Sequence, residues 1–137
     1  MNNDEIMYSY TRAQAIEDGE QVCLSEKFPE DCALYKYPVY CTRRVWEVIE
    51  SAVKNPEAGN DFSGVIWDLC YMSAKAPGRK EIYGGAGVEF TVIITGSDVP
   101  PDFYEGECPC YQLHSICGAL DMEDPRPAIT IQFPDED

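Results

Sequence analysis

The apolar residues of this chain change their spacing near its middle, and this change limits the folds that the chain can adopt. Apolar side chains first recur at helical spacing in two segments, 43–54 and about 61–75. Later segments rich in β-branched residues, at 88–95, 110–119 and 128–133, have the pattern of strands. We therefore predict an α+β fold in which two amphipathic helices pack on one face of a three- to four-stranded antiparallel sheet.

Capping and breaking residues mark the ends of the helices. Thr42 is the expected N-cap of the first long helix, and Pro77-Gly78 ends the second. Near the start of the chain, Thr11 and Gln14 have the spacing of a capping box. This spacing predicts a short helix that ends at Gly19, which can adopt the left-handed conformation of a C-terminal cap.

Shorter segments are expected between and after these helices. Residues 21–24 are predicted to form a short strand at an edge of the sheet, and the segment 25–36 has room for one helical turn. Residues 37–41 are expected to be extended. The segment 96–109, which holds two consecutive prolines, and the segment 121–127 are predicted to be loops.

The length of the chain indicates one domain. A chain of 137 residues has room for one core of ordinary size, so residues 1–137 are predicted to form a single domain with an acidic tail at 134–137. No apolar run reaches the roughly 20 residues of a membrane-spanning helix, and the N-terminus lacks the pattern of a secretory signal peptide. We therefore expect a cytoplasmic protein that does not bind membranes, with its seven cysteines as thiols.

The chain is strongly negative. Ten Lys and Arg residues face 25 Asp and Glu residues, which gives a net charge of -15, and such a surface repels nucleic-acid backbones. We predict a non-enzymatic protein that binds a basic protein surface and does not bind nucleic acid directly; the alternative is that the charge only keeps the protein soluble. The candidate binding residues are acidic side chains of the C-terminal half: Asp98, Asp102, Glu105, Glu107, Asp121, Glu123 and Asp124.

One cluster of cysteine and histidine residues has the composition of a zinc site but not the spacing. Cys108, Cys110, His114 and Cys117 lie within ten residues, without a Cys-x-x-Cys pair. If this segment is a strand, Cys110 and His114 lie on one face and Cys117 on the other. We therefore predict neither a metal site nor a cofactor here.

A catalytic site would have to be built around the single histidine, His114. Neither a G-x-S-x-G nor an H-E-x-x-H motif is present, so we expect no enzymatic activity; an enzyme that uses His114 remains one alternative. The glycine-rich segment 84–87 precedes a strand instead of a helix and lacks the lysine of a phosphate-binding loop. We expect it to be a turn.

Aromatic residues support a second alternative, a small-molecule binding domain that forms a homodimer or a larger assembly. Tyrosine rings near an arginine would stack on a planar, nucleotide-like ligand. The residues in this alternative are Tyr35, Tyr37, Tyr83 and Tyr104, with Arg43 or Arg79.

Short motifs along nearly the whole chain resemble a family of small bacterial proteins of unknown function, often encoded on plasmids, integrative elements and phages. The most specific motif is the opening block Tyr8-Ser9-Tyr10-Thr11-Arg12-Ala13-Gln14-Ala15. The other motifs are Val45-Trp46, Ile66-Trp67-Asp68-Leu69, Val88-Glu89-Phe90 and Ala128-Ile129-Thr130-Ile131. The resemblance implies an accessory protein of a mobile element and identifies no catalytic residues. With the acidic charge, it suggests an inhibitor of a host defence complex.

Overall fold

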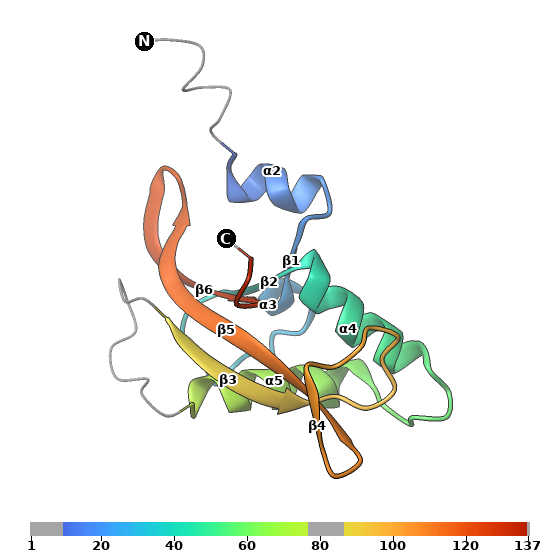
Figure 1. The fold of residues 1–137 in the computed structure, drawn as a ribbon. Coiled ribbons are helices and arrows are strands. Elements are labelled where there is room, and N and C mark those ends of the chain that lie inside the picture. The colour runs from blue at the N-terminus through green and yellow to red at the C-terminus, as the bar shows by residue number, and fades with distance from the viewer. Residues whose placement is uncertain (1–9, 77–86, 137) are drawn as a thin grey trace.

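The computed structural model describes residues 10–76 and 87–136, and this part of the chain contains four helices and six strands (Figure 1). The elements in chain order are α2 (Arg12–Glu17), β1 (Gln21–Cys23), α3 (Leu24–Lys27), β2 (Val39–Thr42), α4 (Arg43–Lys54), α5 (Phe62–Ala74), β3 (Val88–Ile93), β4 (Phe103–Glu105), β5 (Cys108–Asp121) and β6 (Asp124–Gln132). The predicted α+β class is confirmed.

Three of the four described helices, α2, α4 and α5, begin at a side chain that accepts a hydrogen bond from a backbone N–H group. Thr11 accepts from Gln14 N and the Gln14 side chain accepts from Thr11 N, so the predicted capping box is present. Thr42 accepts from Val45 N at the start of α4, and Asp61 accepts from Gly64 N at the start of α5. Each of these bonds satisfies a donor that has no partner within its helix.

The sheet differs from the predicted one in its size and in one pairing direction. Its strand order is β1-β2-β6-β5-β3, and β4 pairs with β5. The expectation of three to four antiparallel strands is therefore wrong, because six strands are present in the described residues and β2 runs parallel to β6. This parallel pairing places Val39 opposite Ile129 and Cys41 opposite Ile131, which continues one apolar face across both strands.

The predicted loop at 96–109 contains the short strand β4. This strand pairs with the start of β5 across a two-residue turn, in which Gly106 has a φ of 64°. Its three residues are all exposed, so β4 lacks the alternation of apolar and polar residues that identifies a strand in a sequence.

The predicted loop at 121–127 is also wrong, because β5 extends to Asp121 and β6 begins at Asp124. Pro125 and Pro127 lie within β6, although proline cannot donate to a strand ladder. Alternate residues of a strand point their backbone nitrogens to the same side, so the nitrogens of residues 125, 127 and 129 share one side of β6. This side faces β2, because Ile129 N donates to Pro38 O, directly before β2. The pairing of β2 covers only 129–131, so among the described residues no strand lies beside the two prolines on this side and no ladder bond to β2 is lost.

The core lies between the sheet and the two long helices. Alternate residues of β3, β5 and β6 are buried against α4 and α5, for example Val92 of β3, Leu113 of β5 and Ile131 of β6. Both helices therefore cover one face of the sheet, as predicted. The shorter helix α2 lies apart from them, beside the hairpin that joins β5 to β6 (Figure 1).

Candidate functional site

The seven acidic candidates fall into two groups at opposite ends of β5. Asp98, Asp102, Glu105 and Glu107 precede its first residue, whereas Asp121, Glu123 and Asp124 lie at the hairpin that follows it. A strand of 14 residues spans roughly 40 Å at about 3.3 Å per residue. The structure therefore does not bring the seven side chains together on one face.

Three of the seven carboxylates hold parts of the fold together. Asp121 accepts from Arg12 N and Ala13 N (2.9 and 3.1 Å), so it caps α2 from the opposite end of the sequence. Several backbone hydrogen bonds lower the pKa of Asp121, and the bond from Arg12 N has the largest effect. Arg126 donates to both oxygens of Asp124 and lowers the pKa of that carboxyl to about 2.

The third of these carboxylates is Asp102, which accepts from Gln112 N at 2.7 Å. The other four candidates, Asp98, Glu105, Glu107 and Glu123, are exposed. Within residues 10–76 and 87–136, their carboxylates form no ion pair or hydrogen bond.

One of them, Asp98, lies at a hollow that the sequence analysis did not anticipate. This first hollow, of about 580 Å³, lies between α4 and the loop 97–99, and Glu47, Glu50 and Asp98 all line it. Ser51 holds the loop on the helix, because its hydroxyl accepts from Asp98 N (3.0 Å) and contacts Ser97 Oγ (2.8 Å).

The first hollow is acidic. Its one cationic lining residue, Lys54, lies 3.5 Å from the carboxylate of Glu50, one helical turn away. The sequence analysis missed Glu47 and Glu50 because charged residues on the outer face of an amphipathic helix are usually only solvated. Glu47 and Glu50 are three residues apart and therefore lie side by side on the helix. Asp98 joins them in the lining of the hollow only because the loop 97–99 packs on α4.

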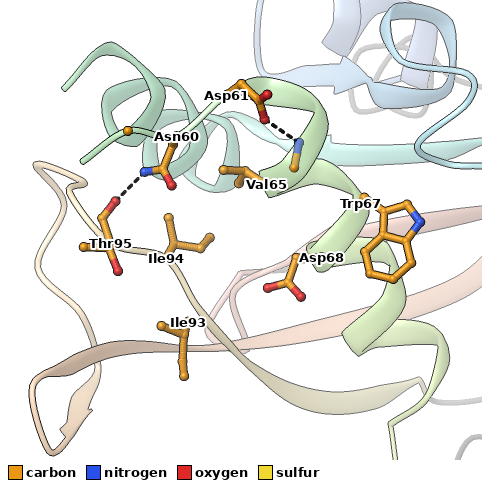
Figure 2. A pocket seen from close by; sticks show the side chains of 10 residues that line it. Asn60, Asp61, Val65, Trp67, Asp68, Ile93, Ile94 and Thr95 are labelled. Atoms are coloured by element: carbon orange, nitrogen blue, oxygen red, sulfur yellow. Dashed lines mark hydrogen bonds between the residues drawn. The ribbon is translucent and has the colours of Figure 1, made fainter. Parts of the chain in front are cut away.

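A second hollow, of about 450 Å³, lies between α5 and the end of β3. Figure 2 shows Asp68 pointing from α5 toward Ile93 and Ile94, with Trp67 beside it on the helix. Asn60 fixes the connection between the two helices, because its side-chain amide donates to Thr95 O at 2.7 Å (Figure 2) and also to Ala52 O at 3.2 Å.

Asp68 is the unusual residue of the second hollow. Its carboxylate has no hydrogen-bond or ion-pair partner among the described residues, and partial burial raises its pKa. The neighbouring Trp67 is 46% exposed and stacks on Tyr71, with ring centroids 5.0 Å apart. A half-buried carboxylate beside an exposed indole suits a cationic group, since both the charge and the ring face attract it.

The cysteine and histidine candidates are spread over both faces of β5. Cys117 is buried in the core, whereas Cys110 and His114 lie on the opposite face, as the alternation along a strand predicted. Cys108 is exposed at the start of the strand. Within the described parts of the chain, no group of three or more potential metal ligands is found.

His114 lies on the face of the sheet that does not pack against α4 and α5. Its strand neighbours are Glu89 of β3 and Gln132 of β6. Ser115, the hydroxyl nearest to it in sequence, is fully buried on the core side. A Ser-His pair within β5 is therefore not formed.

The described tyrosines of the nucleotide alternative lie in different surroundings. Tyr35 contacts Ser73 Oγ through its hydroxyl at 2.7 Å and packs on the core, whereas Tyr104 is 62% exposed on β4. Tyr37 also packs against the core, and Arg43 pairs with Glu20 at 2.9 Å. Tyr83 and Arg79 lie outside the described residues, as do residues 84–86 of the glycine-rich segment.

Together these features define an α+β protein with two acidic hollows near the connection between α4 and α5. A further acidic hollow, of about 500 Å³, lies at the hairpin between β5 and β6 and is lined by the predicted residues Asp121, Glu123 and Asp124. The family model DUF6573, a family of unknown function, matches residues 1–137. The chain belongs to this family. The searches of curated proteins and of solved structures gave no match. In the part of the chain that the structure describes, no helix has the length and apolar character needed to span a membrane.

Proposed function

We propose that this protein is a non-enzymatic binding protein that engages a basic protein surface through the end of the molecule that holds the two hollows. We call this region the acidic end; its carboxylates are those of Glu47, Glu50, Asp61, Asp68 and Asp98. One observation carries the proposal. The two hollows border the connection between α4 and α5, and Lys54, the one lysine among the described residues that line them, already has a carboxylate partner.

The charge of the acidic end favours a cationic partner over a neutral or anionic one. Nearby carboxylates of like sign repel one another, and a bound Lys or Arg side chain relieves this repulsion. In the second hollow, such a side chain would meet the carboxylate of Asp68 and the indole of Trp67 together. Attraction over longer distances would also speed the encounter.

The partner that we propose is a host defence protein with a surface that binds nucleic acid. Carboxylates can occupy sites that have evolved for phosphate groups, because both are anionic oxygen acceptors. The resemblance to proteins of mobile elements supports this choice, since such elements benefit from blocking host nucleases.

Affinity capture from lysate of the natural host, followed by titration of the purified partner, tests the proposal. We expect a triple variant of the acidic end, Glu47→Gln, Glu50→Gln and Asp98→Asn, to weaken binding roughly tenfold, since three surface charges of about 0.5 kcal/mol each amount to this factor. Affinity should also fall as NaCl increases from 50 to 500 mM, because salt screens charges that lie more than about 10 Å apart.

The matched control removes three exposed carboxylates elsewhere, with Glu17→Gln, Glu26→Gln and Glu30→Gln. It has the same net charge as the triple variant of the acidic end. If only the overall charge matters, both variants weaken binding equally, and the proposed site is wrong. A partner whose affinity depends neither on salt nor on the acidic end would contradict the proposed function itself.

A further inference from the structure

Two of the buried cysteines are in contact, although 37 residues separate them in the sequence. The Sγ atoms of Cys32 and Cys70 lie 3.8 Å apart, and the residues are 3% and 0% exposed. Cys32 lies in the turn-rich segment 29–37 after α3, and Cys70 lies on the inner face of α5. No disulfide joins them, since every cysteine is a free thiol.

The segment that carries Cys32 is held along α5 by contacts on both sides of the cysteine. Before Cys32, the carboxylate of Asp31 accepts from Ser63 Oγ at 2.7 Å. After it, the hydroxyl of Tyr35 contacts Ser73 Oγ at 2.7 Å. The two thiols therefore face each other because the flanking residues fix the position of the segment.

The two thiols have different acidities. Cys70 donates its S–H to Cys32, which lowers the pKa of Cys32 and raises the pKa of Cys70. Ser25 also lowers the pKa of Cys32 by a hydrogen bond. Since the thiolate is the nucleophile in sulfur chemistry, Cys32 is suited to react first and Cys70 to react second.

We propose that Cys32 and Cys70 are a redox-active pair that closes to a disulfide when the protein meets hydrogen peroxide and reopens in a thiol reductant. The thiolate of Cys32 attacks one peroxide oxygen and breaks the O–O bond, which gives a sulfenic acid and, with the released proton, one water. The sulfur of Cys70 then attacks the sulfur of Cys32. The S–S bond forms, the S–O bond breaks, and the proton of Cys70 leaves in a second water.

Two thiols are thereby oxidised by two electrons, and one peroxide is reduced to two waters. The two sulfur atoms must approach from 3.8 Å to about 2.05 Å. The burial of both residues favours an oxidant as small as peroxide over bulky disulfides. The closed bond would tie the segment 29–37 to α5 and remove chain entropy from the unfolded state.

Tryptic mapping of the full chain tests the proposal, because four of the seven cysteines fall on separate peptides. Cys23 lies in 13–27, Cys32 in 28–36, Cys41 in 37–43 and Cys70 in 55–75. After brief treatment of the native protein with peroxide, we expect the peptides 28–36 and 55–75 to be joined. The intact mass should fall by about 2 Da, and dithiothreitol should reverse both changes.

Variants of single cysteines make the result specific. Cys70→Ala should abolish the joined peptides and leave Cys32 oxidised without a bond, whereas Cys41→Ala, which removes another buried thiol of the core, should keep them. The oxidised wild type should melt roughly 5 to 15 °C above the reduced protein. Circular dichroism shows whether each variant folds. The tryptic map of the peroxide-treated wild type tests the proposal even if a variant does not fold.

Two results would overturn the proposal. One is a peroxide-treated wild type in which the peptides 28–36 and 55–75 stay reduced and separate. The other is a disulfide that joins Cys32 or Cys70 to a different cysteine. Neither result bears on the acidic end, since the pair lies in the core and its test uses no partner.

Discussion

Single side chains connect parts of the fold that lie far apart in the sequence. Asp121 caps α2, and Arg12 in turn donates from its guanidinium to Leu120 O and Gln21 Oε1. The guanidinium also lies 4.1 Å from the centroid of the Tyr40 ring, and its burial lowers the pKa of Arg12. The hairpin between β5 and β6 and the helix α2 therefore stabilise each other.

The cap on α2 predicts how acid affects stability. The lowered pKa of Asp121 means that its carboxylate contributes stability above about pH 4, the unfolded pKa, and loses it as the pH falls through the folded pKa. We therefore expect Asp121→Asn to be less stable than wild type at pH 7 and to lose less stability between pH 4 and pH 2. Urea unfolding across this range measures both effects.

Glu123→Gln is the control for this experiment, because Glu123 is exposed at the same hairpin and caps no helix. Its stability should follow that of wild type from pH 7 to pH 2. If the curve of Asp121→Asn runs parallel to that of wild type in acid, the carboxylate of Asp121 does not have the role assigned to it.

At the scale of elements, aromatic rings fasten the helices to one another. Trp46 of α4 stacks on Phe62 of α5, with centroids 5.5 Å apart and planes 8° apart, and Phe28 stacks on Phe62 at 5.5 Å. Phe28 directly follows α3, so the cluster joins α4 and α5 to the end of α3. The position of α5 relative to α4, and with it the shape of both hollows, depends on these contacts.

Removal of the central ring should therefore destabilise the protein. We expect Phe62→Ala to lower the free energy of unfolding by about 2 to 3 kcal/mol, slightly less than for a fully buried phenylalanine. The matched control is Trp67→Ala on the outer side of the same helix, where the ring is 46% exposed and the loss should stay below about 1 kcal/mol. Equal losses in urea unfolding would show that the cluster has no special role.

Two substitutions of Asp61, the N-cap of α5, distinguish the contribution of its capping bond to stability from the contribution of its charge. Asp61→Ala removes the acceptor of Gly64 N and should cost about 1 kcal/mol of stability. Asp61→Asn keeps an acceptor and should cost less than half of that, while it removes the same negative charge. Thermal unfolding of both variants checks the difference, and equal losses would mean that charge dominates over the capping bond.

At the scale of the whole molecule, the net charge of -15 acts against the folded state. Folding brings like charges closer together, and salt weakens their repulsion. We therefore expect the melting temperature at pH 7 to rise by several degrees as NaCl increases from 10 to 300 mM. The change should be smaller at pH 4.5, where part of the carboxylates bind protons. A melting temperature that falls with salt would show that attractive ion pairs outweigh the repulsion.

Much of the local structure could be predicted from the sequence. The helix α4 begins at Arg43 and ends at Lys54, as its apolar spacing and the N-cap Thr42 predicted. The capping box of Thr11 and Gln14 is also present. In contrast, the strand β4 and the first part of β6 were missed, because exposed residues and prolines hide the pattern of a strand.

The candidate site was predicted less well than the fold. Asp98 was among the predicted residues and does line a hollow, but its neighbours Glu47 and Glu50 were not. Asp121, which was predicted to bind a partner, caps α2, and this role was not anticipated. Composition can show that a chain is acidic, but it does not show which carboxylates already have a partner within the fold.

The sequence by itself determined the helix limits, the alternation along β5 and the excess of negative charge, because these depend on neighbours within a few positions or on simple sums. Only the tertiary structure decided that β2 runs parallel to β6, that Asp98 lines the same hollow as Glu47, and that Cys32 touches Cys70. The physical reason is that such contacts join distant segments. They form only when the whole core is packed, so no short pattern records them.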